Sequence, residues 1–129
     1  MLYPIDRFKL QALDEEKSRL VHDGVETPVI LDGVTLEAQF KCEKGYLLLL
    51  THDCPYEECL HVYRLALDLT ILDHRKLGAI YTPAILADVA ITAPDSLEFS
   101  FFGGDLWRVT LLGRRTLFRR RLLHLRRKV

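Results

Sequence analysis

Long apolar runs are missing from this 129-residue chain. A membrane-spanning helix needs about 20 consecutive apolar residues, and the apolar stretches here are much shorter. Pro4, Asp6 and Arg7 interrupt the beginning of the sequence before the apolar region of a secretion signal could form. We therefore expect a cytoplasmic protein with no transmembrane segment.

Cysteine is scarce, and the motifs of common enzyme classes are absent. Three cysteines cannot all pair within one chain, which suits a reducing compartment. There is no nucleophile elbow, phosphate loop, dinucleotide glycine motif or HExxH motif. Asp68, Asp73 and His74 are close in sequence and could serve as acid, base and orienting group, but acids beside a turn are usually solvated. These features favour a non-catalytic protein without deciding the question.

The composition is that of a folded globular domain. Hydrophobic residues make up 49% of the chain and charged residues 28%, so disorder is excluded. A chain of this length suits one domain with one core.

Alternation of apolar and polar residues predicts strands along most of the chain. Residues 34–40 are an example, because Val34, Leu36 and their alternate neighbours are apolar while the residues between them are polar. Asp32-Gly33 predicts a hairpin between strands at 27–31 and 34–40, and a further turn is expected near Asp68. The spacing of hairpins predicts an all-β antiparallel meander of about eight to ten strands, forming a sandwich or a barrel over residues 1–113.

Two helices are predicted beside the strands. Acidic residues at 14–16 and Gly24 mark the boundaries of a short helix ending near His22; a second strand at 19–22 is the alternative. After Gly113, an apolar stripe recurs at helical spacing and predicts a basic C-terminal helix within residues 114–129. The stripe consists of Phe118, Leu122, Leu125 and Val129.

The stretch 45–73 holds a candidate metal site. A hairpin with a four-residue turn at 55–58 would pair Cys54 with Cys59 and His52 with His61. Zinc prefers thiolate and imidazole ligands, although the usual spacing of structural zinc cysteines is absent. Ordinary packing of small buried residues is the favoured interpretation, and a Cys54–Cys59 redox pair is a third.

The same hairpin predicts which residues lie opposite each other on its two strands. It would place Leu50 opposite Tyr63 and Leu48 opposite Leu65, so that one apolar face ends in the His/Cys quartet. A later hairpin would pair Phe101 with Trp107, and its other apolar residues would share that face.

Charge is divided unequally along the chain. Residues 1–113 hold 10 Lys and Arg against 18 Asp and Glu, whereas residues 114–129 hold eight basic residues and no acid. Candidate partner-binding residues are Tyr56 at the tip of the central hairpin and the basic residues of the tail. The latter are Arg114, Arg115, Arg119, Arg120, Arg121, Arg126, Arg127 and Lys128.

The charge division favours a small binding or adaptor domain that recognises another protein or a second copy of itself. The favoured interpretation of the tail itself is a docked element whose arginines neutralise the acidic body. Zinc binding at the His/Cys quartet, structural or hydrolytic, is the alternative. Nucleic acid or an anionic membrane held by the tail comes third.

Overall fold

The computed structural model describes residues 1–52, 58–78, 85–101, 105–113 and 122–128. All regular secondary structure within these ranges is β-strand, which confirms the all-β prediction. The strands are β1 (Tyr3–Pro4), β2 (Phe8–Ala12), β3 (Lys17–His22), β4 (Val25–Asp32), β5 (Thr35–Cys42), β6 (Gly45–Thr51), β7 (Cys59–Ala66), β8 (Ile71–Gly78), β9 (Ala87–Ala93), β10 (Ser96–Phe101), β11 (Asp105–Leu111) and β12 (Leu123–Lys128). No described residue belongs to a helix that is long and apolar enough to cross a membrane.

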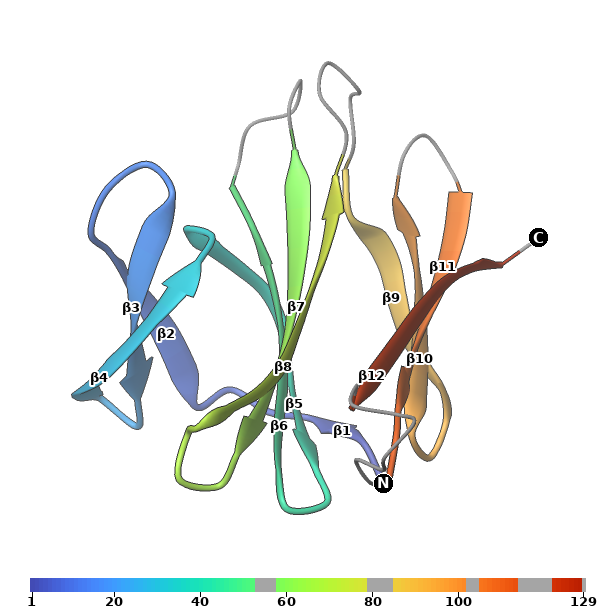
Figure 1. The fold of residues 1–129 in the computed structure, drawn as a ribbon, viewed down its shortest axis with the longest axis horizontal. Coiled ribbons are helices and arrows are strands. Elements are labelled where there is room, and N and C mark those ends of the chain that lie inside the picture. The colour runs from blue at the N-terminus through green and yellow to red at the C-terminus, as the bar shows by residue number, and fades with distance from the viewer. Residues whose placement is uncertain (53–57, 79–84, 102–104, 114–121, 129) are drawn as a thin grey trace.

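The strands form three antiparallel sheets stacked in layers (Figure 1). The central sheet has the order β1-β5-β6-β7-β8, the N-terminal sheet β2-β3-β4 and the C-terminal sheet β12-β11-β10-β9. The central sheet lies between the other two. The fold is therefore a sandwich with three layers and two cores, where the sequence predicted a single core.

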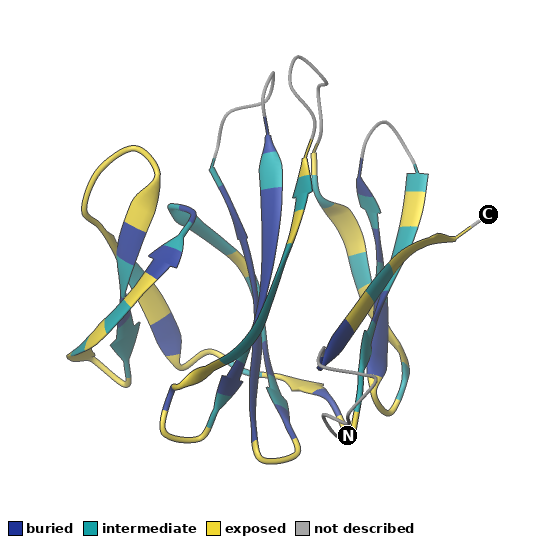
Figure 2. Ribbon diagram, viewed as in Figure 1, coloured by how far each residue is buried: buried dark blue, intermediate teal, exposed yellow. Residues whose placement is uncertain are grey.

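Strand β6 is buried along its whole length, as Figure 2 shows for the middle of the central sheet. Tyr46, Leu48 and Leu50 pack in the core beside the N-terminal sheet, whereas Leu47 and Leu49 pack in the core beside the C-terminal sheet. A strand covered on both faces needs apolar residues at consecutive positions rather than alternate ones. The apolar run at 46–50 is the sequence signature of this central position.

The predicted N-terminal helix is wrong. The Asp14 carboxylate accepts hydrogen bonds from the backbone N–H groups of Glu16 and Lys17, both at 2.8 Å, so it closes a turn between β2 and β3. Alternation then decides the conformation of β3: Ser18 and Leu20 are buried, and the strand pairs with β2.

The predicted C-terminal helix is also wrong for the residues that the structure describes. Residues 123–128 form β12, which pairs with β11 at the edge of the C-terminal sheet. In this strand Leu123 is buried and Leu125 packs against the same core, while His124 is exposed. Pairing with β11 satisfies the backbone hydrogen-bonding groups of this segment, and it also buries the leucine side chains. Residues 114–121 lie outside the described ranges.

The chain leaves the N-terminal sheet at Asp32-Gly33, where a hairpin was predicted. Strands β4 and β5 belong to different sheets and do not pair. The Asp-Gly hairpin lies instead at Asp23-Gly24, where both residues have positive φ, 50° and 80°, as a tight hairpin turn requires. At Gly33, with φ 116°, an added Cβ would lie 2.7 Å from the Leu50 Cβ. This glycine allows the two sheets to approach.

Both predicted registers are displaced by two residues, so each side chain stays on its predicted face. Leu50 pairs with His61, and the ladder ends at Thr51 and Leu60. Beyond it, the Glu58 carboxylate accepts hydrogen bonds from the backbone N–H groups of His52 and Cys59. In the later hairpin, Trp107 pairs with Phe99 rather than Phe101, because the ladder continues to Phe101 and Asp105.

Arg64 and Asp73, a cross-strand pair of the central sheet, hold the beginning of β12. The Arg64 guanidinium donates to the carbonyl oxygens of Leu112 and Leu122 at 2.7 and 2.8 Å. The Asp73 carboxylate accepts from the backbone N–H groups of Leu122 and Leu123 at 2.8 and 3.0 Å. Asp73, which the sequence offered as an acid or base, therefore has a structural role.

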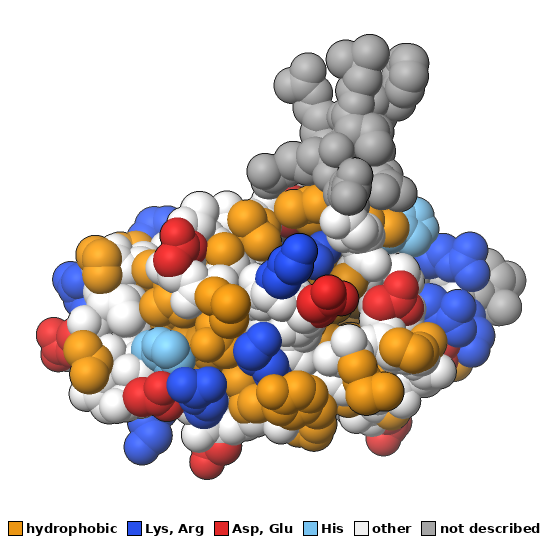
Figure 3. All heavy atoms as spheres, turned by 90° about the horizontal axis from the view of Figure 1, so that it is seen from below, with side chains coloured by type: hydrophobic (Ala, Val, Ile, Leu, Met, Phe, Trp, Pro, Cys, Tyr) orange, Lys and Arg blue, Asp and Glu red, His pale blue; other side chains and the backbone are white. Residues whose placement is uncertain are grey.

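Exposed apolar side chains are interspersed with charged ones on the lower face of the molecule (Figure 3). Leu67 and Ile71, at the β7–β8 turn, are 56% and 43% exposed. Isolated exposed apolar side chains are normal on soluble proteins, so this face does not by itself indicate an interface.

Candidate metal centre between two sheets

Side chains on one face of the central sheet change from apolar to polar towards one end. On β7, Leu65 and Tyr63 belong to the core beside the N-terminal sheet, and His61 and Cys59 follow at alternate positions. His61 lies opposite Leu50, and Tyr63 lies opposite His74 on β8. The end of this core is therefore lined with imidazoles instead of leucines.

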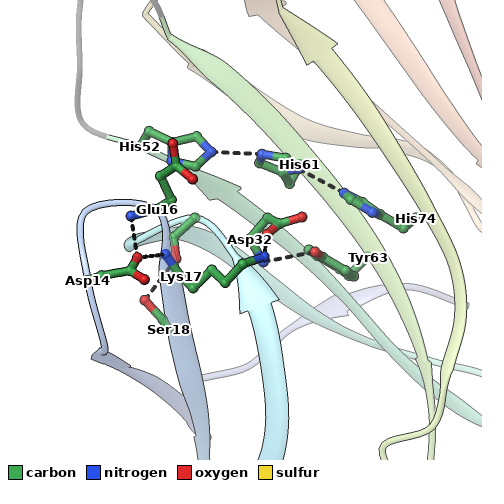
Figure 4. A network of polar contacts seen from close by, with 10 residues as sticks. Asp14, Glu16, Lys17, Ser18, Asp32, His52, His61, Tyr63 and His74 are labelled. Atoms are coloured by element: carbon green, nitrogen blue, oxygen red, sulfur yellow. Dashed lines mark hydrogen bonds and ion pairs between the residues drawn. The ribbon is translucent and has the colours of Figure 1, made fainter.

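Three histidines form a continuous chain of ring contacts (Figure 4). The Nε2 of His61 lies 2.8 Å from the Nε2 of His52, and its Nδ1 lies 2.8 Å from the Nε2 of His74. The His61 side chain is only 3% exposed. Each contact needs one donor and one acceptor, so the protons on these rings have to be arranged in one direction along the chain.

Burial lowers the pKa of His61 to about 4, and the neighbouring imidazoles His74 and His52 add to the effect. His61 is therefore neutral near pH 7. A neutral imidazole has one ring nitrogen with a free lone pair, which is the form that binds a metal ion.

Asp32 reaches this cluster from the other sheet. It is the last residue of β4, in the N-terminal sheet, and its side chain points towards the histidines in Figure 4. Lys17 is its cross-strand partner on β3, and the Lys17 Nζ lies 2.5 Å from the Asp32 Oδ1. This ammonium holds the pKa of the Asp32 carboxyl below its usual range, so the carboxylate is ionised at neutral pH.

Tyr63 positions two members of the cluster. Its ring stacks on His74 with 4.1 Å between the ring centroids and 7° between the planes. Its hydroxyl oxygen accepts a hydrogen bond from the backbone N–H of Asp32 at 2.9 Å. Burial raises the pKa of Tyr63 to about 12, so the hydroxyl keeps its proton. The rotamer of Tyr63 thus links the imidazole of one sheet to the carboxylate-bearing strand of the other.

The cluster lines an open cleft of about 790 Å³ between the N-terminal and central sheets. The acidic residues of the β2–β3 turn line one side of the cleft. Cys59 and Lys76 line it together with the histidines. Small molecules and ions can therefore approach the imidazoles from solvent.

Asp32, His61 and His74 lie close enough to hold a metal ion, because their ligand atoms are all within 4.8 Å of one another. Zinc is bound at about 2.0–2.2 Å by imidazole nitrogen and carboxylate oxygen, which places tetrahedral ligands roughly 3.4 Å apart. The His61–His74 contact would open slightly and the half-exposed Asp32 side chain would move inward. Two imidazoles and a carboxylate are a donor set that zinc and related ions accept.

The structure places the predicted site residues in different surroundings. His52 and His61 are in contact, and Cys59 lines the same cleft. Cys54 and Tyr56 lie outside the described residues, as do the arginines of 114–121. The remaining tail residues are in β12: Arg127 pairs with Asp105 at 3.2 Å and Lys128 with Glu98 at 3.1 Å, while Arg126 lies opposite Arg108.

The ligand set includes two residues that the sequence did not assign to a metal. His74 could have been found, because a hairpin turning near Asp68 places it opposite Tyr63 and therefore diagonal to His61. The sequence gives no such indication for Asp32, because its approach to the histidines depends on how the N-terminal sheet packs on the central sheet.

Comparisons of the chain with protein-family models, with curated proteins and with solved structures found no match. The arrangement of side chains is therefore the basis for any statement about function.

Proposed function

We propose that this protein binds a zinc-class metal ion in the cleft between its N-terminal and central sheets, through Asp32, His61 and His74. The observation that carries the proposal is the close approach of two imidazoles from one sheet and a carboxylate from another. The imidazoles of His61 and His74 already lie 2.8 Å apart, so only a small movement is needed for both rings to bind one ion.

The hydrogen bonds around the three residues support this ligand set. If the Nδ1 of His61 binds the ion, its Nε2 carries the proton and donates to the Nε2 of His52, which lies 2.8 Å away. A metal-binding histidine usually donates its second N–H in this way, which fixes its tautomer and orientation. His52 then acts as a supporting partner rather than as a ligand.

The number of ligands favours an accessible ion over a closed structural one. Structural zinc sites usually have four protein ligands, whereas three protein ligands and an open position are typical of catalytic sites. Asp32, His61 and His74 supply three, and all three line an open cleft. Such an ion would supply Lewis acidity and an activated water to a bound molecule.

Zinc titration of metal-free protein by isothermal calorimetry tests the proposal. We expect about one zinc per chain. Asp32→Asn and His74→Gln should each lower the affinity by at least the roughly 10–100-fold that loss of a supporting partner costs. His124→Gln on β12, an exposed histidine, is the matched control and should bind as the unmodified protein does.

Cys59→Ser separates this ligand set from the His/Cys quartet. The variant should keep its zinc, and the cobalt-substituted protein should lack thiolate-to-metal absorption. Loss of zinc from Cys59→Ser, together with unchanged binding by Asp32→Asn, would reject the Asp/His set in favour of the quartet.

The adaptor role that the charge division predicts stays a prediction. The described tail residues Arg127 and Lys128 are engaged in ion pairs within the C-terminal sheet, and the other tail arginines, apart from Arg126, lie outside the described residues.

A further inference from the structure

We propose that Lys17 determines which metal ions the cleft accepts, an inference that rests on the proposed metal site. Lys17 is presented to Asp32 by the β3–β4 ladder, in which the two residues are direct cross-strand partners. Its Nζ lies 2.5 Å from the Asp32 Oδ1. The carboxylate that faces the histidines is therefore already paired with a protein cation.

This pairing removes the net negative charge of the ligand set. Asp32 is the carboxylate that lies within ligand distance of His61 and His74 among the described residues, and the Lys17 ammonium compensates its charge. The two imidazoles contribute none while they are neutral. A divalent ion entering the site thus meets imidazole lone pairs and a carboxylate that is already paired, while the acidic side chains of the β2–β3 turn contribute only to the general potential of the cleft.

Metal ions differ in how much they depend on carboxylate charge. Manganese prefers carboxylate, carbonyl and water oxygens and stands at the weak end of the divalent series, whereas zinc binds imidazole well. Compensation of Asp32 by Lys17 should therefore weaken manganese binding more than zinc binding. Lys17 acts in this account as a specificity-determining residue for the ion, not as a ligand.

Lys76 provides a matched comparison within the same cleft. It lines the cleft and lies opposite His61 on β8, and among the described contacts no ion pair joins it to Asp32. Removing the Lys76 charge alters the general potential felt by any divalent ion. Removing the Lys17 charge also uncovers one particular oxygen ligand, so only this change should alter the preference between ions.

The experiment measures zinc affinity by calorimetry and manganese affinity by electron paramagnetic resonance at the same pH and salt concentration. Lys17→Met should tighten zinc binding about threefold and manganese binding about tenfold, which narrows the preference for zinc. Lys17→Arg keeps the positive charge, so this variant should have the same preference for zinc over manganese as the unmodified protein. Lys76→Met should strengthen both ions by the same factor and leave the preference unchanged.

The outcomes distinguish this inference from the site on which it rests. Equal effects of Lys17→Met on both ions, or a preference unchanged in Lys17→Met and Lys17→Gln alike, would overturn the role of Lys17 while zinc binding stands. Absence of zinc binding in the unmodified protein and in all three Lys17 variants would overturn the metal site itself. Lys17 is exposed, and circular dichroism of each variant establishes that its fold is intact.

Discussion

The buried imidazole of His61 should make the metal-free protein lose stability as the pH falls from 7 to 5. A histidine in the unfolded chain has a pKa near 6.5, whereas the pKa of His61 in the folded protein is about 4. Between these values the unfolded chain binds a proton that the folded protein does not. Acidification therefore favours unfolding across this window, and the loss is complete once the pH is below 4.

The magnitude follows from the two pKa values. Proton linkage gives a loss of about 0.7 kcal/mol at pH 6 and about 1.8 kcal/mol at pH 5, relative to pH 7. Carboxylates with a lowered pKa, such as Asp32, lose their contribution mainly below pH 5, because unfolded aspartates titrate near 3.9. The interval from pH 7 to 5 therefore isolates the histidine contribution.

Urea unfolding at pH 7, 6 and 5, with chelator present throughout, measures this contribution. His61→Gln should flatten the pH dependence by about 2 kcal/mol over the interval, even if the variant is less stable at every pH. His124→Gln, which alters an exposed histidine, should keep the original dependence. Equal pH dependence in the unmodified protein and His61→Gln would refute the assignment of a buried, neutral His61.

Two further variants test the packing within the central sheet and the attachment of β12 to it. Gly45→Ala should destabilise the protein by about 3 kcal/mol or more, because the added Cβ would lie 2.0 Å from a backbone oxygen of Leu65. At Gly113 an added Cβ meets no atom of the described residues within 4 Å, so Gly113→Ala is the control for the melting temperatures. Arg64→Met should cost about 2–3 kcal/mol by leaving two carbonyl oxygens at β12 without their charged donor. Amide exchange at Leu123 should become faster, and unchanged protection there would contradict the role given to Arg64.

The alternation of apolar and polar residues was sufficient to predict which side chains of a strand share a face. Alternation along the central hairpin placed His52, His61 and Tyr63 on one face, although the predicted register was two residues off. A displacement of two residues preserves faces, because side chains alternate along a strand. The displacement does change which side chains lie opposite each other on the two strands. The length of the turn determines that pairing.

The two predicted helices show where local pattern was insufficient. Acidic residues at 14–16 indicate a helix start, but Asp14 closes a turn, and pairing with β2 makes the following residues a strand. The leucines of the C-terminal segment fit a helical stripe as well as one face of a strand. Pairing with the edge of β11 favours the strand over the helix. The spacing of apolar residues along the sequence does not show which strand will be a neighbour in space.

The sequence alone determined that the chain consists mainly of β-strands, which side chains of a strand share a face, and that imidazoles continue the apolar face of the central hairpin. Tertiary structure decided that the sheets form three layers and that Asp-Gly at 32–33 joins two of them. It also brought Asp32 from the N-terminal sheet to His61 and His74 of the central sheet. Side-chain periodicity is a property of single strands, whereas a site between sheets depends on how separate strands pack.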